Sequence, residues 1–135
     1  MPEPYRRAVT EVPPPTVDDL LADARAALPR RPTAGELDGL LAAGVLVVDL
    51  RPSEVRAAEG ALPGAVVVER NVLEWRLDPT SDHRLPEVTD HDQLVVLVCN
   101  DGYASSLAAA SLHRLGLRRV TDLDGGYRRW ATQRG

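Results

Sequence analysis

Apolar positions recur at two spacings along the chain, and each spacing predicts one kind of element. Over residues 17–28 they fall three or four residues apart behind Thr16 as a helix N-cap, which predicts a first helix. Thr33 and Glu36 have capping-box spacing and predict a second helix over 34–43. Continuous apolar runs rich in Val predict strands of a sheet that is buried on both faces, at 45–50, 65–68, 94–98 and 119–123.

Helical patterns fill the intervals between these runs, at 53–58, 71–77, 104–115 and 126–133. Gly116 ends the third of these helices, and we expect the face that packs on the sheet to consist of Leu107, Ser111, Leu112 and Leu115. The alternation of strands and helices predicts an α/β fold with a mainly parallel sheet. We expect one domain over residues 17–135, preceded by a flexible, proline-rich arm over residues 1–16.

Composition and charge narrow the classes of function. A chain of 135 residues with 44% hydrophobic and 27% charged residues is typical of one globular domain. Its net charge of -4 argues against a nucleic-acid partner, and all 16 basic residues are arginine, which excludes a lysine Schiff base. We interpret the arginine-rich stretch 105–135 as a solvated basic face, with a docking patch as the alternative. No stretch is apolar enough for a signal peptide or a membrane span, which predicts a cytoplasmic protein without membrane association.

Cys99 is the only cysteine, so it cannot form an internal disulfide. It follows the strand expected at 94–98 and precedes a helix expected to start at residue 104, with Gly102 in the turn between them. At such a place the helix dipole and a curl of backbone N–H groups favour a thiolate. From spacing alone, an inert cysteine that ends a core strand is an equal alternative.

Four motifs follow one another along the chain. They are VDLR at residues 48–51, GALPGA at 60–65, the cysteine loop, and LDGGYRRW at 123–130. In this order they resemble the rhodanese-like domain family, in particular its single-domain bacterial sulfurtransferases, over residues 17–135. The resemblance implies a three-layer α/β/α fold with a five-stranded, mainly parallel central sheet. It also implies a cysteine that alternates between thiolate and persulfide, without a cofactor or a metal.

The same resemblance assigns roles to individual residues. Cys99 is the expected catalytic nucleophile. The backbone of the loop and helix start is expected to cradle the persulfide, at Asn100, Asp101, Gly102, Tyr103, Ala104 and Ser105. We interpret Asp49 and Arg51 as a structural pair at the end of a strand, with direct catalysis as the alternative.

Substrate contacts are expected from the stretch between the second and third strands. This stretch is similar to one that packs close to the mouth of the site in single-domain rhodaneses, and its candidates are Arg70, Trp75 and Arg76. The alternative is that Trp75 seals the edge of the core while Arg76 points to water.

Two positions depart from the thiosulfate-using members of the family, which carry arginines one and five residues after the cysteine. Here these positions are Asn100 and Ala104, and Asp101 adds a negative charge. We therefore expect dianionic thiosulfate to bind poorly unless Arg76 or Arg70 reaches the site. The expected sulfur donor is a small persulfide or the persulfide of another protein. The expected acceptor is a thiol, another nucleophile or a partner sulfur-carrier protein.

Sulfur transfer on Cys99 is thus the predicted activity. Phosphatases that share the scaffold need an arginine six residues after the cysteine to clamp the oxyanion, and Ser105 occupies that position. The other alternative is a non-catalytic or regulatory rhodanese module that acts through protein binding. We expect a monomer or a weak homodimer.

Overall fold

All the apolar runs that predict strands are strands in the computed structural model, which describes residues 1–8 and 11–134. The helices also form where the periodicity predicts them, and their ends differ from the prediction by two residues or fewer. In chain order the elements are η1 (Glu3–Tyr5), α1 (Val17–Ala27), α2 (Ala34–Ala42), β1 (Leu46–Asp49), α3 (Ser53–Glu59), β2 (Val66–Val67), η2 (Arg70–Val72), α4 (Leu73–Leu77), β3 (Val95–Val98), α5 (Ala104–His113), β4 (Val120–Asp122) and α6 (Gly126–Gln133).

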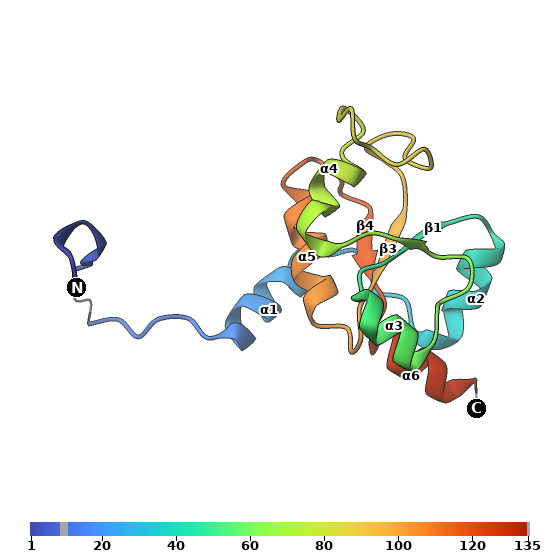
Figure 1. Cartoon of the computed structure of the whole chain (residues 1–135), viewed down its shortest axis with the longest axis horizontal. Coiled ribbons are helices and arrows are strands. Elements are labelled where there is room, and N and C mark those ends of the chain that lie inside the picture. Colours follow the sequence, from blue (N-terminus) through green and yellow to red (C-terminus); the bar gives the residue numbers. More distant parts are fainter. Residues whose placement is uncertain (9–10, 135) are drawn as a thin grey trace.

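The strands form one parallel sheet in the order β2-β1-β3-β4 (Figure 1). Val48 pairs with Leu97, and Leu97 pairs with Asp122, so the central strands are in register. Because all strands are parallel, their carboxyl ends meet at one edge of the sheet. The loop after β3, which starts at Cys99, therefore lies between the loop after β1 and the loop after β4.

The expectation of a fifth strand is wrong, because the sheet formed by the described residues has four strands. The chain before α2 does border the free edge of β4. Asp124 N–H donates to Pro32 O at 3.0 Å, and Thr121 Oγ1 donates to Pro29 O at 3.3 Å. Pro29 and Pro32 have no N–H group to donate in return, so this segment cannot form a strand ladder.

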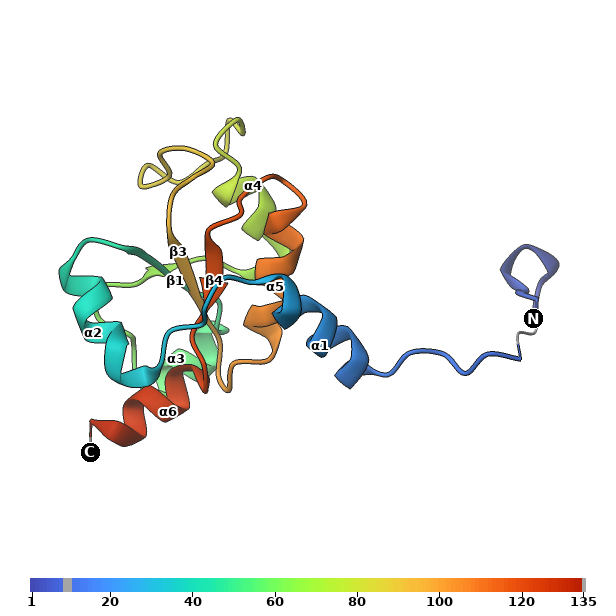
Figure 2. The same ribbon diagram turned by 180° about the vertical axis from the view of Figure 1, so that it is seen from behind.

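Side chains alternate between the two faces of the sheet, and helices cover both faces (Figures 1 and 2). Val48 and Leu97 point into a core that also contains side chains of α4 and α5. Val47 and Val96 point into a second core with side chains of α2 and α6. The three-layer α/β/α arrangement is thus confirmed, and a sheet buried on both faces explains why the strands are continuously apolar.

The prediction of which α5 residues face the sheet is partly wrong. Leu112 is buried in the core as expected, but its companions there are Ala108 and Ala109. Leu107 lies between α5 and α1, and Leu115 is 37% exposed. Small alanine side chains let α5 approach the sheet closely, and the packing of α1 on its outer side covers the larger Leu107. Ser111 is only partly buried.

Both predicted helix caps are present. Thr16 and Asp19 form a capping box at α1, and Thr33 and Glu36 form one at α2. Residues 11–16 are exposed, contain no helix or strand, and run away from the domain ahead of α1 (Figures 1 and 2). The flexibility of the arm stays a prediction. In the described part of the chain, no helix is both long and apolar enough to cross a membrane.

Candidate active site

Cys99 lies directly after β3, where a buried strand gives way to the loop before α5. Its Sγ accepts hydrogen bonds from Gly102 N–H at 3.2 Å and from Ser105 N–H at 3.4 Å. The residue is 9% exposed, and it opens to a pocket of about 200 Å³ lined by Cys99, Asn100, Asp101, Tyr103 and Ala104. Sγ therefore lies at the positive end of the α5 dipole, within reach of solvent.

Gly102 gives the loop a conformation that other residues adopt with strain. Its φ angle is 84°. A Cβ at this position would lie 2.9 Å from Gly125 N and 3.0 Å from Leu123 O. The loop thus packs with its backbone directly on the chain that leads into α6, which explains why the turn requires glycine.

The start of α6 holds the cysteine loop from the other side. Tyr127 N–H donates to Cys99 O at 2.9 Å, and Arg128 N–H donates to Asn100 O at 3.0 Å. Gly126 has a φ angle of 65°, and a Cβ there would lie 2.6 Å from Asn100 O. The second glycine of the LDGGYRRW motif, Gly126, therefore allows the start of α6 to lie against the loop, and the first amides of α6 donate to the loop carbonyls.

A buried polar cluster lies beneath Cys99. Cys99 Sγ is 3.2 Å from Ser105 Oγ, and Ser105 Oγ donates to Asp122 Oδ2 at 2.7 Å. Ser106 Oγ donates to the same carboxylate oxygen at 2.7 Å, and Arg31 Nε donates to Oδ1 at 2.7 Å. Asp122, Ser105 and Ser106 are fully buried. A buried carboxylate therefore lies one hydroxyl away from the candidate nucleophile.

Arginine side chains fix the loop from outside this cluster. Arg25 Nη2 and Arg31 Nη2 donate to Gly102 O at 2.7 Å and 3.0 Å. Arg128 donates to Asp101 at 2.8 Å and to Glu59 at 2.9 Å. The hydrogen bond from Arg128 holds the pKa of Glu59 below its ordinary value. Because Arg128 is the partner of Asp101, the loop is less negative than its sequence indicates.

The expected Asp49–Arg51 pair is present at the end of β1. Arg51 Nη2 donates to Asp49 Oδ2 at 2.8 Å, and Arg51 Nε donates to Oδ1 at 3.0 Å. Arg51 also donates to Gly60 O at 3.0 Å. Both side chains are buried and neither lines the Cys99 pocket, which agrees with a structural role.

The three expected substrate contacts lie outside the set of residues that line the Cys99 pocket. Arg70 forms an ion pair with Glu74 at 2.9 Å, and Arg76 donates to His83 O at 2.7 Å. Trp75 is 58% exposed, so the alternative that it seals the edge of the core is wrong. A contact of Arg70, Trp75 or Arg76 with substrate stays a prediction.

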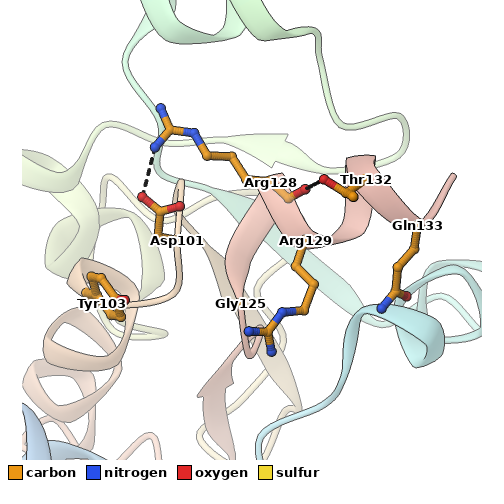
Figure 3. A pocket seen from close by; sticks show the side chains of 7 residues that line it. All are labelled: Asp101, Tyr103, Gly125, Arg128, Arg129, Thr132 and Gln133. Carbon is orange, nitrogen blue, oxygen red and sulfur yellow. Dashed lines mark hydrogen bonds and ion pairs between the residues drawn. The ribbon is translucent and has the colours of Figure 1, made fainter. Parts of the chain in front are cut away.

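A larger hollow, whose lining side chains are drawn in Figure 3, shares two of them with the Cys99 pocket. It has a volume of about 470 Å³ and is lined by Asp101, Tyr103, Gly125, Arg128, Arg129, Thr132 and Gln133. Asp101 and Tyr103 belong to both pockets and form the wall between them. Arg129 in this hollow lies 3.6 Å from Asp124, and Arg134 pairs with Asp38. The arginines in α6 and directly after it are thus solvent-exposed and are compensated by acidic partners.

Sequence reasoning does not find the cluster beneath the cysteine. In the sequence, Asp122 belongs to no motif and lies close to a second acid, Asp124, and Arg31 belongs to no motif either. The available signal is Asp122 itself, a charged residue at the end of an otherwise buried strand, where it needs buried partners. The consecutive Ser105 and Ser106 at the start of α5 are candidates for those partners.

Solved structures of other proteins are similar to this chain in fold. A human single-domain sulfurtransferase is 26% identical, with 76% of this chain and 96% of that chain covered at a TM-score of 0.63. A rhodanese homologue from the extremely thermophilic bacterium Thermus thermophilus is 33% identical, with 74% and 99% covered at a TM-score of 0.53. A protein of unknown function from Rhodopseudomonas palustris, described as a possible tyrosine phosphatase, is 26% identical, with 95% and 98% covered at a TM-score of 0.79.

This chain is an α/β domain whose cysteine loop lies at the carboxyl ends of a parallel sheet. Residues 33–133 match the rhodanese-like domain family. The match spans most of the chain and includes every strand and the whole cysteine loop. The chain therefore belongs to the rhodanese-like domain family.

Proposed function

We propose that the protein is a sulfurtransferase that carries sulfane sulfur as a persulfide on Cys99 and passes it to a thiol. The observation that carries this proposal is the position of Cys99. Its Sγ accepts hydrogen bonds from two backbone N–H groups at the start of α5, and the residue lines a pocket. The similar human protein is a single-domain sulfurtransferase, which supports the same activity here.

The reaction has two halves. In the first, the Cys99 thiolate attacks the outer sulfur of a donor persulfide, so an Sγ–S bond forms while the donor S–S bond breaks, and the electron pair leaves with the donor thiolate. In the second, an acceptor thiolate attacks the outer sulfur of the Cys99 persulfide, and the Sγ–S bond breaks to regenerate the Cys99 thiolate. The N–H groups of Gly102 and Ser105 and the α5 dipole stabilise negative charge on the sulfur atoms during both halves.

The charges around the pocket favour a donor of low charge. Ala104 and Asn100 supply no cation, and the Asp101 carboxylate is at the rim. Arg128 compensates Asp101 but is itself shared with Glu59. We infer that a small organic persulfide loads Cys99 more readily than dianionic thiosulfate. We further propose that the acceptor thiol, free or on a sulfur-carrier protein, approaches through the larger hollow beside the same loop (Figure 3).

The related Rhodopseudomonas palustris protein, described as a possible tyrosine phosphatase, raises phosphate transfer as a competing activity. A cysteine phosphatase needs a guanidinium that clamps the phosphate oxygens. Six residues after Cys99 this chain has Ser105, which is fully buried and donates to Asp122. The site therefore favours sulfur as the transferred group.

Intact-mass spectrometry tests the proposal directly. The protein is incubated with cysteine persulfide, with thiosulfate or with an aryl phosphate, and a gain of about 32 Da per sulfur is sought on Cys99. Cysteine persulfide is expected to load the wild type, an added thiol to remove the sulfur, and Cys99→Ser to stay unloaded while folding normally. Aryl phosphate turnover that requires Cys99, or no loading by either sulfur donor, would overturn the proposal. In the second case, binding of a partner that is insensitive to Cys99→Ser would identify a non-catalytic module.

A further inference from the structure

The hydroxyl of Ser105 connects the candidate nucleophile to a buried carboxylate. Ser105 Oγ lies 2.7 Å from Asp122 Oδ2 and 3.2 Å from Cys99 Sγ. A serine hydroxyl has one proton, and an ionised carboxylate only accepts. The proton of Ser105 is therefore committed to Asp122, and the side of the oxygen that faces Sγ is a lone pair.

The buried carboxylate of Asp122 is surrounded by donors, among them the guanidinium of Arg31. Arg31 donates to both carboxylate oxygens, at 2.7 Å to Oδ1 and 3.2 Å to Oδ2. Ser106 donates a second hydroxyl to Oδ2, and Arg25 Nε in turn donates to Ser106 Oγ at 3.2 Å. In this arrangement the hydrogen bond from the Ser105 hydroxyl to Asp122 is favoured over one to Sγ.

We propose that Asp122 is a positioning residue that acts on Cys99 through Ser105, by holding the Ser105 hydroxyl as a hydrogen-bond acceptor toward Sγ. A thiol S–H donates to this oxygen, whereas a thiolate Sγ faces its lone pair. In a persulfide, Sγ is the uncharged inner sulfur and the negative charge resides on the terminal sulfur. The Asp122–Ser105 pair thus disfavours a negative charge on Sγ itself. It favours the persulfide state, in which the charge is on the terminal sulfur.

The remaining groups that face Sγ act independently of Asp122. From the loop, Gly102 and Ser105 donate backbone N–H groups to Sγ, which stabilise a charge there and oppose the effect of the Ser105 hydroxyl. Asp101 in the loop is paired with Arg128 of α6. Only the benefit to the persulfide state rests on the proposed sulfur transfer. The direction of the Ser105 hydrogen bond does not depend on whether Cys99 carries sulfur.

Asp122→Asn reverses the hydrogen bond. The amide oxygen can keep the contact with Arg31, while its NH₂ group donates to Ser105 Oγ and frees the Ser105 proton to turn toward Sγ. The measurement is the second-order rate constant for alkylation of Cys99 by iodoacetamide at neutral pH. We expect an increase of about 3- to 10-fold, the effect of one hydrogen bond gained by the thiolate.

A double-variant cycle separates positioning from a merely structural role. Asp122→Asn is expected to have no effect on alkylation in a Ser105→Ala background, because the effect passes through the Ser105 hydroxyl. Acceleration by Asp122→Asn that persists without Ser105, or an unchanged rate with Ser105 present, contradicts the proposal. Thermal unfolding of each variant shows that the folded protein is being compared.

Ser106 offers a matched control that survives even if Asp122→Asn fails to fold. Ser105 and Ser106 both donate to Asp122 Oδ2 at 2.7 Å, but only Ser105 contacts Sγ. Ser105→Ala removes the lone pair that faces Sγ and is expected to accelerate alkylation, whereas Ser106→Ala keeps that lone pair and is expected to have a much smaller effect. Equal effects of the two variants overturn the proposal. If the cycle holds but no donor loads Cys99, the proposed sulfur transfer fails and the positioning role stands.

Discussion

The guanidinium carbon of Arg51 lies 3.6 Å from the centre of the Tyr127 ring. This contact links the end of β1 to α6, and Tyr127 N–H in turn donates to Cys99 O. Arg51 is 2% exposed and its charge is compensated by Asp49. The VDLR and LDGGYRRW motifs therefore meet in space, and they support the cysteine loop together.

Replacement of Arg51 tests this support. Arg51→Met is expected to lower the free energy of unfolding by about 3–5 kcal/mol, because Asp49 is left as an uncompensated buried charge. Addition of Asp49→Asn to this variant is expected to restore part of the loss, and Arg118→Met, at an exposed arginine, serves as the control. Urea denaturation measures all of these variants. Equal losses in Arg51→Met and Arg118→Met would contradict this supporting role.

Gly126 is the closest point of approach between α6 and the cysteine loop. Gly126→Ala places a methyl group against the backbone of Asn100 and imposes strain at a positive φ angle. We expect a loss of at least about 2 kcal/mol in unfolding free energy, together with slower persulfide loading. Gly39→Ala is the matched control, because Gly39 is in the interior of α2 with no atom within 4 Å of the added methyl group. That variant should be stabilised by about 0.5–1 kcal/mol and load normally.

Acid is expected to weaken the cap of α2. The hydrogen bond from Arg30, with further ones from Thr33, lowers the pKa of Glu36 from 4.5 to about 2. A carboxyl whose pKa is lower in the folded state stabilises the protein fully above its unfolded pKa, and this contribution is lost as pH falls from 4.5 through about 2. The difference in melting temperature between the wild type and Glu36→Gln should therefore be constant at neutral pH and shrink over that interval.

Glu87→Gln controls for the loss of one negative charge at an exposed position. If the melting temperatures of the wild type and Glu36→Gln differ equally above and below this pH interval, the charge of Glu36 does not contribute to the cap.

Local patterns were sufficient for the elements and for the position of the nucleophile. Periodicity and capping residues are properties of neighbouring residues, so Thr16 and Thr33 could be assigned as caps from sequence. The strand, glycine and helix around Cys99 placed it at the carboxyl edge for the same reason. The prolines at 29 and 32 were visible too, but their consequence for a fifth strand depends on which strand they border.

Partners distant along the chain could not be predicted. Arg31 and Asp122 are 91 residues apart, and neither belongs to a motif of its own. The charge of Asp101 looked uncompensated because its partner Arg128 is 27 residues further on. Such pairs depend on the packing of helices against the sheet, and burial then makes them obligatory, because a carboxylate such as Asp122 cannot remain in the interior alone.

Loop charge is expected to limit the use of thiosulfate. Ala104 is exposed, lines the Cys99 pocket and begins α5, so an arginine at this position extends from the loop rim without displacing core atoms. Ala104→Arg should raise kcat/KM for thiosulfate by about 2- to 30-fold, the effect of about 0.5–2 kcal/mol from one partly exposed ion pair. Steady-state kinetics at low and high salt measure the gain, which should largely vanish at high salt.

An uncharged organic trisulfide is the control donor for this variant, because it gains no ion pair from Arg at position 104. Equal gains with both donors would point to a general improvement of the protein and not to anion binding. A wild type that already turns over thiosulfate rapidly, with no change in Ala104→Arg, would show that another cation binds the anion. Alanine replacements of Arg70, Arg76 and Arg84, one at a time, would then identify that cation.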